Sequence, residues 1–476
     1  MGVPAYRIGV TQRATDATAA DDPTQPADGP ADDPTQPADG PADDPTQPAD
    51  GPAVQALTAP RDGVPAPIAT AAELDRAVAV LGAGTGPVAV DAERASGYRY
   101  GQRAYLVQLR RAGAGTVLID PVGCPDLRAL GSALADAEWV VHAASQDLPC
   151  LAELGMVPRR LFDTELAGRL VGFERVGLGA MVERVLGLRL EKGHSAADWS
   201  TRPLPEPWLR YAALDVEVLI ELRDAMAEEL ACQGKLAWAA EEFAALVAAS
   251  PPPPRIDPWR RTAGVHRLRS RRQLAAVREL WHARDELARA RDVAPGRILP
   301  DAAIINATLA APASADELIR LPVFGGRSTR RHAARWFRAL TRARTMTDSD
   351  LPAVAPTYDG PPPANRWAER EPAAAARLAR ARASLGELAA ELGMPVENLV
   401  QPDAVRRLAW TPPAGPTPGA VADALRALGA RDWQIGLAAA RLAVALTAVG
   451  EPTCEPHRRT HRRTGAAAVH FPAGDV

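Results

Sequence analysis

The spacing of apolar positions predicts one domain of mixed strands and helices, followed by helical domains. After Thr70, a residue type that often caps helices, apolar residues recur with helical spacing over Ala71–Leu81. Short β-type runs separated by turns come next, at Pro87–Asp91, Ala104–Leu109, Thr116–Asp120 and Trp139–His142. Helical spacing then covers Asp163–Val171, Leu178–Leu186 and Pro207–Leu230. Strands followed by alternating helices predict an α/β domain over residues 66–245.

Two proline-rich breaks divide the rest of the chain. Four consecutive prolines after Ser250 predict a stiff linker over residues 246–264, and a second proline-rich stretch predicts another over residues 347–364. Between these breaks, and again after the second one, the apolar spacing is helical nearly throughout. We therefore expect two all-α domains, over residues 265–346 and 365–450.

The two ends of the chain offer few apolar residues to bury. The segment DDPTQPADGPA occurs three times in tandem over residues 21–53, and residues 1–65 carry eleven Asp and three Arg, a net charge of −8. Segments of this composition cannot offset the entropy lost on ordering. We expect residues 1–65 to form a disordered acidic tail and residues 451–476 a second disordered tail.

Charge is strongly segregated, although the 476-residue chain has a net charge of only −3. From Arg255 to Arg344 there are twenty Arg and eight acidic residues, a net charge of +12, which favours a polyanionic partner. The sequence shows neither a membrane-spanning apolar run nor a secretory signal, and its four dispersed cysteines suggest no disulfide framework or zinc site. We expect a cytoplasmic monomer with no membrane role.

Three short motifs bring candidate chemistry to the predicted α/β domain. Asp91 and Glu93 stand two residues apart at the end of an apolar run, so on a strand both project to one face. Asp147 follows a buried run and a turn, and we expect it in the first turn of a helix. Tyr211 and Asp215 are four residues apart in a helical stretch and therefore share one helix face. Taken singly, the first two motifs are better explained without chemistry, as a solvated strand edge and as a carboxylate favoured by the helix dipole. The third can be an incidental polar pair on an exposed helix face.

Phosphodiester cleavage gives a reason to combine the motifs. Hard divalent metals prefer oxygen ligands, and a two-metal mechanism requires several carboxylates within a small volume. Two Mg²⁺ or Mn²⁺ ions about 3.5–4 Å apart would clamp the scissile phosphate, one activating water and the other stabilising the leaving oxygen. Four carboxylates can neutralise such a pair, and a phenol beside them can orient the attacking water.

In order and spacing, the three motifs resemble those of the DEDD exonuclease superfamily, tyrosine subclass: Asp91-x-Glu93, the stretch from His142 to Asp147, and Tyr211-x-x-x-Asp215. Lys192 and the following Ser195–Leu204 segment are similar to the stretch that ribonuclease D proteins carry before their third motif. By this resemblance the chain is identified as a member of the ribonuclease D family.

The resemblance implies a ribonuclease H-like fold and a metal-dependent 3′-5′ exoribonuclease. Such an enzyme would release nucleoside 5′-monophosphates from single-stranded RNA 3′ ends, for example those of tRNA precursors. Asp91, Glu93 and Asp215 would bind the metal that carries the nucleophile, and Asp91 would also bridge to a second metal held by Asp147. Tyr211 would position the water. His142 would pack or hydrogen-bond beneath the site, because Mg²⁺ prefers oxygen ligands.

The chain departs from the family pattern beside its first motif. Many relatives have Thr between the two acidic residues and an aromatic residue after them, where this chain has Ala92 and Arg94. Neither position is a metal ligand, so the departure affects the grip on the terminal nucleotide rather than the chemistry. Candidate nucleic-acid contacts are Arg94, Arg99, Arg103 and Lys192; for the three arginines, an equally good explanation is that they are solvated loop residues.

The helical part of the chain carries a second resemblance. Residues Gln273–Arg344, including the Gly325–Gly326 turn, resemble the HRDC domain shared by RecQ-type helicases and ribonuclease D. Met394–Val400 echoes Ala294–Pro300, which suggests that the last helical domain is a second, degenerate HRDC-like copy.

Two other functions are consistent with parts of this pattern. A DNA 3′-5′ exonuclease would use the same motifs, because they hold metals and phosphate and do not read the 2′-hydroxyl. A non-catalytic nucleic-acid-binding scaffold would keep the fold, but the intact set of four carboxylates and a tyrosine argues against it.

Overall fold

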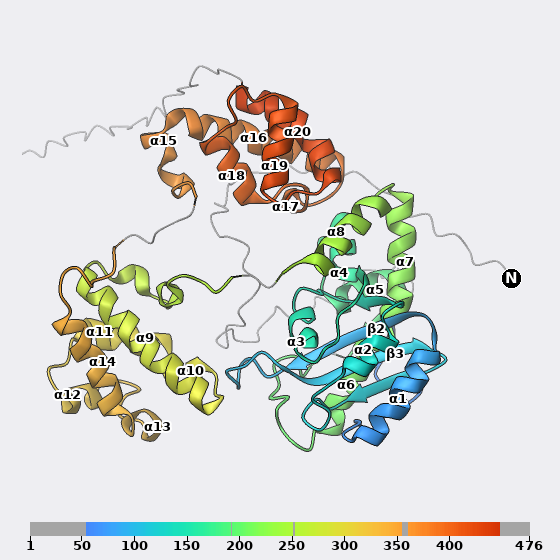
Figure 1. The fold of residues 1–476 in the computed structure, drawn as a ribbon, viewed down its shortest axis with the longest axis horizontal. Helices are drawn as coiled ribbons and strands as arrows, with labels where there is room; N and C mark the ends of the chain where they lie inside the picture. Colours follow the sequence, from blue (N-terminus) through green and yellow to red (C-terminus); the bar gives the residue numbers. More distant parts are fainter. Residues whose placement is uncertain (1–53, 192, 251–252, 355–359, 448–476) are drawn as a thin grey trace, which may run out of the picture. The chain divides into compact units, whose positions relative to one another are not determined.

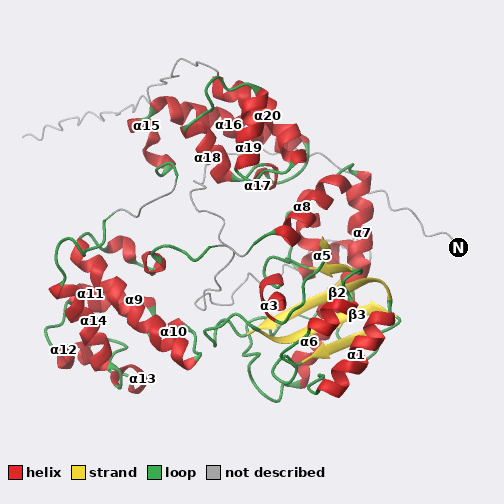
Figure 2. Cartoon of the chain, in the orientation of Figure 1, coloured by secondary structure: helices red, strands yellow, loops and turns green. Residues whose placement is uncertain are grey.

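The computed structural model describes residues 54–191, 193–250, 253–354 and 360–447 (Figure 1). Lys192, the acidic repeats and the expected tail at residues 451–476 lie outside the described residues. Strands are confined to the first part of the chain and helices make up the rest, as Figure 2 shows. The prediction of an α/β domain followed by helical domains is therefore confirmed. Within the described ranges, no helix combines the length and apolar character needed to cross a membrane.

A five-stranded mixed sheet forms the centre of the α/β domain, in the order β4-β3-β2-β5-β6. Its strands are β2 (Thr85–Arg94), β3 (Ala104–Ala112), β4 (Gly115–Ile119), β5 (Glu138–Val141) and β6 (Arg160–Asp163). The first three are antiparallel, whereas β5 and β6 run parallel to β2. Strand β6 was missed by the sequence pattern, which starts a helix at Asp163; that residue instead ends the strand and caps α4 (Thr164–Leu170).

The two faces of β2 pack against different helices. Val88 and Val90 join the main core, which includes residues of α1 (Ala71–Ala83). Ala89 points the other way and packs with Val216 and Leu219, from α6 (Glu206–Glu217) and α7 (Leu219–Cys232). Because side chains alternate along a strand, the residues two and four positions beyond Ala89 also face α6. Helix α1 begins with the expected cap, since Thr70 and Glu73 form a capping box.

The structure differs from the expected acidic tail at residues 54–65. Strand β1 (Gln55–Leu57) pairs in parallel with β7 (Leu188–Leu190), and Leu57 packs against the main core. Arg61 lies 3.7 Å from the buried carboxylate of Glu217. A few apolar residues after the last repeat are enough to anchor this segment, which therefore belongs to the α/β domain.

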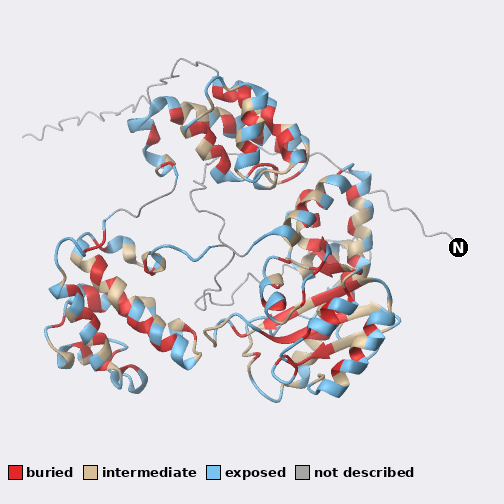
Figure 3. Cartoon of the chain, viewed as in Figure 1, coloured by how far each residue is buried: buried red, intermediate tan, exposed pale blue. Residues whose placement is uncertain are grey.

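The middle helical domain has its own core. Helices α9 (Arg271–Arg291), α11 (Asp301–Ala310) and α14 (Ala333–Thr345) enclose a cluster that includes Trp336. Trp259, only 1% exposed, belongs to the same cluster, although residues 246–264 were expected to be linker. Burial of this large apolar indole is favourable. The middle domain therefore begins at or before Trp259, inside the segment that was expected to be linker. Figure 3 shows buried residues recurring along these helices.

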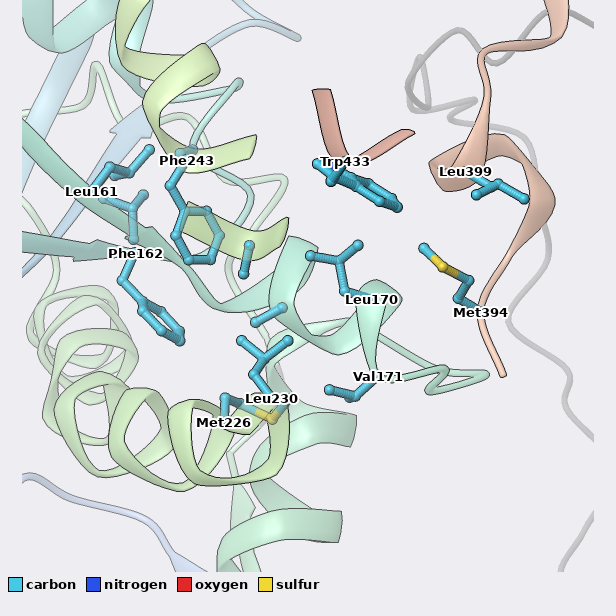
Figure 4. Packing of buried hydrophobic residues seen from close by; sticks show 14 of the residues in the cluster. Leu161, Phe162, Leu170, Val171, Met226, Leu230, Phe243, Met394, Leu399 and Trp433 are labelled. Atoms are coloured by element: carbon cyan, nitrogen blue, oxygen red, sulfur yellow. The ribbon is translucent and has the colours of Figure 1, made fainter. Parts of the chain in front are cut away.

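The last helical domain packs on the α/β domain. It contains α16 (Pro372–Glu391), α18 (Pro402–Trp410), α19 (Pro418–Ala427) and α20 (Asp432–Thr447). Figure 4 shows its Trp433, Met394 and Leu399 in one cluster with residues of the α/β domain such as Leu170 and Phe243. The ammonium group of Lys235 donates to two carbonyl oxygens, those of Leu170 at 2.8 Å and Leu392 at 2.6 Å, and so links the two domains.

Candidate active site

Strand β2 presents the first two carboxylates. Asp91 and Glu93 continue the face of Ala89, so both project toward α6 as the sequence pattern predicts. The pairing of β2 with β3 shifts register between Glu93 and Arg94, where the strand ends. Asp91 and Glu93 therefore stand near the end of a central strand, which pairs with β3 on one side and β5 on the other.

The third carboxylate follows strand β5. Asp147 is the N-cap residue of α3 (Leu148–Glu153), one position before the helical turn in which we expected it. Its side chain makes no capping hydrogen bond, unlike the side chains of most Asp residues at this position. The carboxylate is consequently available to the cavity rather than to its own helix.

Helix α6 supplies the fourth carboxylate and the phenol. Tyr211 and Asp215 lie one turn apart on this helix, on the face that meets β2. The ring of Tyr211 is surrounded by aromatic neighbours, with ring centroids 6.5 Å from buried Trp199 and 6.0 Å from His194. Because these neighbours restrict the ring, the hydroxyl keeps a defined direction.

One cavity of about 600 Å³ brings all five predicted residues together: Asp91, Glu93, Asp147, Tyr211 and Asp215. Carboxylate oxygens of Asp91, Glu93 and Asp215 lie within 4.8 Å of one another. Asp147 lines the same cavity outside this group of three. The arrangement offers one compact set of oxygen ligands and a further carboxylate beside it.

Burial and mutual repulsion make these carboxylates weak acids. Burial raises the pKa of Asp91 to about 6. Burial, and then repulsion from neighbouring carboxylates, also raises the pKa values of Glu93, Asp147 and Asp215 well above their ordinary range. The pKa of Tyr211 is raised by burial and by Asp215, so its phenol stays protonated. A divalent cation would relieve this concentration of negative charge.

His142 lines the cavity, and its ring forms a hydrogen bond within the protein. Its Nδ1 is 2.9 Å from the hydroxyl oxygen of Thr164, the hydrogen-bonding position we expected beneath the site. Burial lowers the pKa of His142 to about 4, so the imidazole is neutral near pH 7.

The candidate arginines have different environments. Arg94 reaches the site, with Nη2 3.3 Å from Oε1 of Gln146 and 4.0 Å from Oδ1 of Asp147. Arg99 instead donates to the hydroxyl of Ser200 at 2.8 Å, and Arg103 lies over the ring of Tyr105. None of the three arginines is among the described residues that line the cavity, but Arg94 approaches two that are, Gln146 and Asp147. The fourth candidate, Lys192, is outside the described residues.

Sequence reasoning missed Asp163, a buried acidic residue next to the site. Its carboxylate accepts backbone N–H bonds from the turn that carries Asp147. Burial raises the pKa of Asp163 to about 6, and backbone donors oppose that rise. The available signal was an Asp-Thr pair directly after a short apolar run, a typical helix start.

Three family models match the chain. A 3′-5′ exonuclease model covers residues 65–231, and an HRDC domain model covers residues 273–340. Residues 360–446 match a model described as the 3′ to 5′ exonuclease C-terminal domain. The last of these differs from our expectation that the final domain is a second HRDC-like copy.

The chain is similar in sequence to known ribonuclease D proteins and in fold to solved structures. Ribonuclease D of Gluconacetobacter diazotrophicus is 34% identical over 286 residues, which cover 58% of this chain and 71% of that protein. Ribonuclease D of Granulibacter bethesdensis is 32% identical, with coverage of 56% and 69%. Among solved structures, a protein from Bifidobacterium adolescentis superposes with a TM-score of 0.75 at 39% identity, covering 83% of this chain and all of that one.

The structure of Escherichia coli RNase D, an exoribonuclease involved in structured RNA processing, also superposes, with a TM-score of 0.56 at 26% identity. The match covers 72% of this chain and 89% of that one. With the exonuclease motifs gathered at one cavity and this extent of similarity, the chain belongs to the ribonuclease D family of 3′-5′ exoribonucleases.

Proposed function

We propose that the cavity is a two-metal site that removes nucleoside 5′-monophosphates, one at a time, from single-stranded RNA 3′ ends. The observation that carries this proposal is the set of carboxylate oxygens from Asp91, Glu93 and Asp215, all within 4.8 Å of one another. Asp147 and Tyr211 line the same cavity. Oxygen donors at this density suit hard divalent ions such as Mg²⁺ or Mn²⁺.

The donor set fits two ions with different surroundings. Asp91, Glu93 and Asp215 would hold one ion, while Asp91 and Asp147 would hold the second. When bound, such a pair activates water and stabilises the leaving 3′ oxygen. The raised pKa values of these carboxylates support the assignment. They show that the buried carboxylates repel one another when ionised, and a bound cation would remove that repulsion.

Tyr211 contributes orientation rather than base catalysis. Its phenol remains protonated near neutral pH, because burial and Asp215 raise its pKa. A protonated phenol can donate a hydrogen bond and accept another, and its neighbours Trp199 and His194 hold the ring in place. We infer that Tyr211 aligns the attacking water with the phosphorus atom.

Basic groups support a polyanionic substrate. Arg94 is the described arginine that reaches the catalytic carboxylates. The segment Arg255–Arg344, which contains most of the middle helical domain, has a net charge of +12. This charge would steer RNA toward the enzyme. Contacts between its arginines and phosphates would add affinity by releasing counterions. We infer that single-stranded 3′ ends attached to structured RNA, such as tRNA precursors, are the substrates of a cytoplasmic, monomeric enzyme.

The test is digestion of matched oligonucleotides by the purified protein. RNA and DNA of one sequence, labelled at the 5′ end, would be incubated with Mg²⁺, Mn²⁺ or EDTA. We expect stepwise shortening of RNA from the 3′ end with either metal, no reaction with EDTA, and no reaction by Asp215→Asn. Faster shortening of DNA than of RNA would favour the DNA exonuclease, and metal-independent digestion would contradict the proposed site.

A further inference from the structure

The turn that carries Asp147 has an unusual backbone. Ala143 adopts a φ of +58°, in the left-handed region that residues with a Cβ seldom enter. Two backbone bonds then close the turn, from Gln146 N to Ala143 O at 3.0 Å and from Asp147 N to Ala144 O at 3.2 Å. This conformation ends strand β5 abruptly and places Asp147 at the cavity instead of further along the strand.

A buried carboxylate from the neighbouring strand holds this turn. Strands β5 and β6 pair in parallel with Val141 opposite Asp163, so Asp163 stands beside the start of the turn. Its Oδ1 accepts the N–H of Ala143 at 3.1 Å, and its Oδ2 accepts the N–H of Ala144 at 2.9 Å. The two bonds therefore fix the backbone of Ala143 and Ala144, at which the chain turns away from β5.

The same carboxylate also begins helix α4. Oδ1 of Asp163 accepts the N–H groups of Glu165 at 2.9 Å and Leu166 at 3.1 Å. Asp163 thus accepts four backbone N–H groups, two from the turn and two from the helix. It is 4% exposed, so water cannot readily replace any of these bonds.

Only a carboxylate satisfies all four donors at once. An ionised carboxylate accepts through two oxygens and donates nothing, whereas an amide replaces one oxygen with an NH₂ group that cannot accept. A hydroxyl can cap a helix but is a single short acceptor. For helix capping alone, Ser would serve as well as Asp. The bond from Ala144 needs the second oxygen, and both turn bonds need a side chain longer than that of Ser.

We propose that Asp163 is the positioning residue for Asp147: by holding the Ala143–Ala144 turn, it fixes the carboxylate that completes the second metal position. Asp163 itself touches neither metal nor substrate. This inference rests on the proposed two-metal function, and it predicts that Asp163 affects the ion shared with Asp147 more than the ion held by Asp91, Glu93 and Asp215.

The test separates the two roles of Asp163 with two full-length variants. Asp163→Asn can keep Oδ1 as the acceptor for Ala143 and for the cap of α4, but it replaces the oxygen that accepts from Ala144. Asp163→Ser keeps a cap for α4 and loses both turn bonds. Thr70→Ala serves as the matched control, because it removes the cap of α1 in the same domain, away from the cavity. Mn²⁺ binding would be followed by isothermal titration calorimetry, and exonuclease kinetics at several metal concentrations.

For both Asp163 variants we expect the dissociation constant of the weaker Mn²⁺ site to rise about tenfold and that of the tighter site to stay within about twofold. The metal concentration for half-maximal activity should rise in parallel, with excess Mn²⁺ restoring much of kcat. Thr70→Ala should lower only the melting temperature.

If Asp163→Ser binds two Mn²⁺ ions like the wild type, Asp163 is only a helix cap and the inference is wrong. That variant decides the matter even if Asp163→Asn does not fold. A wild-type protein that binds no Mn²⁺ and digests no RNA would instead contradict the proposed function.

Discussion

The guanidinium Nη2 of Arg94 lies 4.0 Å from Oδ1 of Asp147, the candidate carboxylate outside the compact group of three. Arg94 follows Glu93 directly, at the point where β2 ends and its register with β3 shifts. A positive charge therefore stands at the edge of the candidate metal site. We therefore predict that Arg94 contacts a substrate phosphate.

Arg94→Gln should weaken RNA binding more than it slows the chemistry. We expect KM for a single-stranded RNA to rise about tenfold with kcat within about threefold, because a phosphate contact is lost while the four carboxylates remain. The salt dependence of affinity should become shallower by about 0.7 in the log–log slope, the contribution of one phosphate. Steady-state kinetics at several salt concentrations would measure both effects.

Arg103→Gln is the control for this prediction, because Arg103 lies over the ring of Tyr105, whereas Arg94 lies beside Asp147. It should leave KM and the salt slope close to wild type. Equal effects of the two substitutions would show that general positive charge, rather than the place of Arg94, governs binding.

Asp215→Asn should remove activity without harming the fold. Loss of a ligand from the compact group should lower kcat/KM by at least about 10³-fold, corresponding to about 4 kcal/mol of transition-state stabilisation. In EDTA the variant should melt at the wild-type temperature or above it, because one of several repelling buried carboxylates is gone.

Thermal melts with and without Mn²⁺ would check this expectation. Metal should raise the wild-type melting temperature, since it binds only the folded protein, and should raise that of Asp215→Asn much less. An active variant, or one that melts far below wild type without metal, would mean that Asp215 supports the fold instead.

Metal affinity should increase with pH. Without metal, the pKa of Asp91 is raised to about 6, and the pKa values of Glu93, Asp147 and Asp215 are raised further above their ordinary range. Protons therefore occupy the site below these values and must leave when metal binds. We expect tighter Mn²⁺ binding at pH 7.5 than at pH 5.5, with proton release.

Calorimetric titrations in two buffers with different heats of ionisation would count the protons released. No dependence of the binding heat on the buffer, together with equal affinity at both pH values, would show that the carboxylates are already ionised.

Two pairs of residues in the candidate site were predictable, because local periodicity determines which side chains share a face. Two residues two apart on a strand share a face, and two residues four apart on a helix do so as well, which places Asp91 with Glu93 and Tyr211 with Asp215. The family resemblance then brought the separate segments together.

Features that depend on contacts distant in sequence were not predictable in this way. The pairing of β1 with β7 joins segments more than 130 residues apart, and Trp259 becomes a core residue only because a helical bundle closes over it. Asp163 looks like an ordinary helix start until the register of β5 with β6 places it beside Ala143. Each of these depends on which partner the fold brings near, and spacing along the chain does not contain that information.

The interface between the α/β domain and the last helical domain yields the final prediction. Trp433 stacks on Trp238 with ring centroids 5.0 Å apart and planes 10° from parallel, and its Nε1 donates to Oε1 of Glu242 at 3.0 Å. Trp433 is 6% exposed, so this indole is part of the shared core. Trp433→Ala would leave a cavity and remove one of the two polar partners of Glu242, which would keep its ion pair with Arg431 at 3.0 Å. We expect this variant to lower the free energy of unfolding by about 3–5 kcal/mol, mainly through the cavity.

Trp433→Phe is the matched control, because a phenyl ring can still stack on Trp238 but cannot donate to Glu242. It should cost less than the Ala variant, with about 1–3 kcal/mol coming from the lost hydrogen bond. Chemical denaturation of the full chain, followed by tryptophan fluorescence and circular dichroism, would give both values. If Trp433→Ala were as stable as the wild type, the last domain would not stabilise the α/β domain through this contact. If it is destabilised as expected, removing everything after residue 250 should also destabilise the catalytic domain, because the partners of Trp238 and Glu242 would be lost with it.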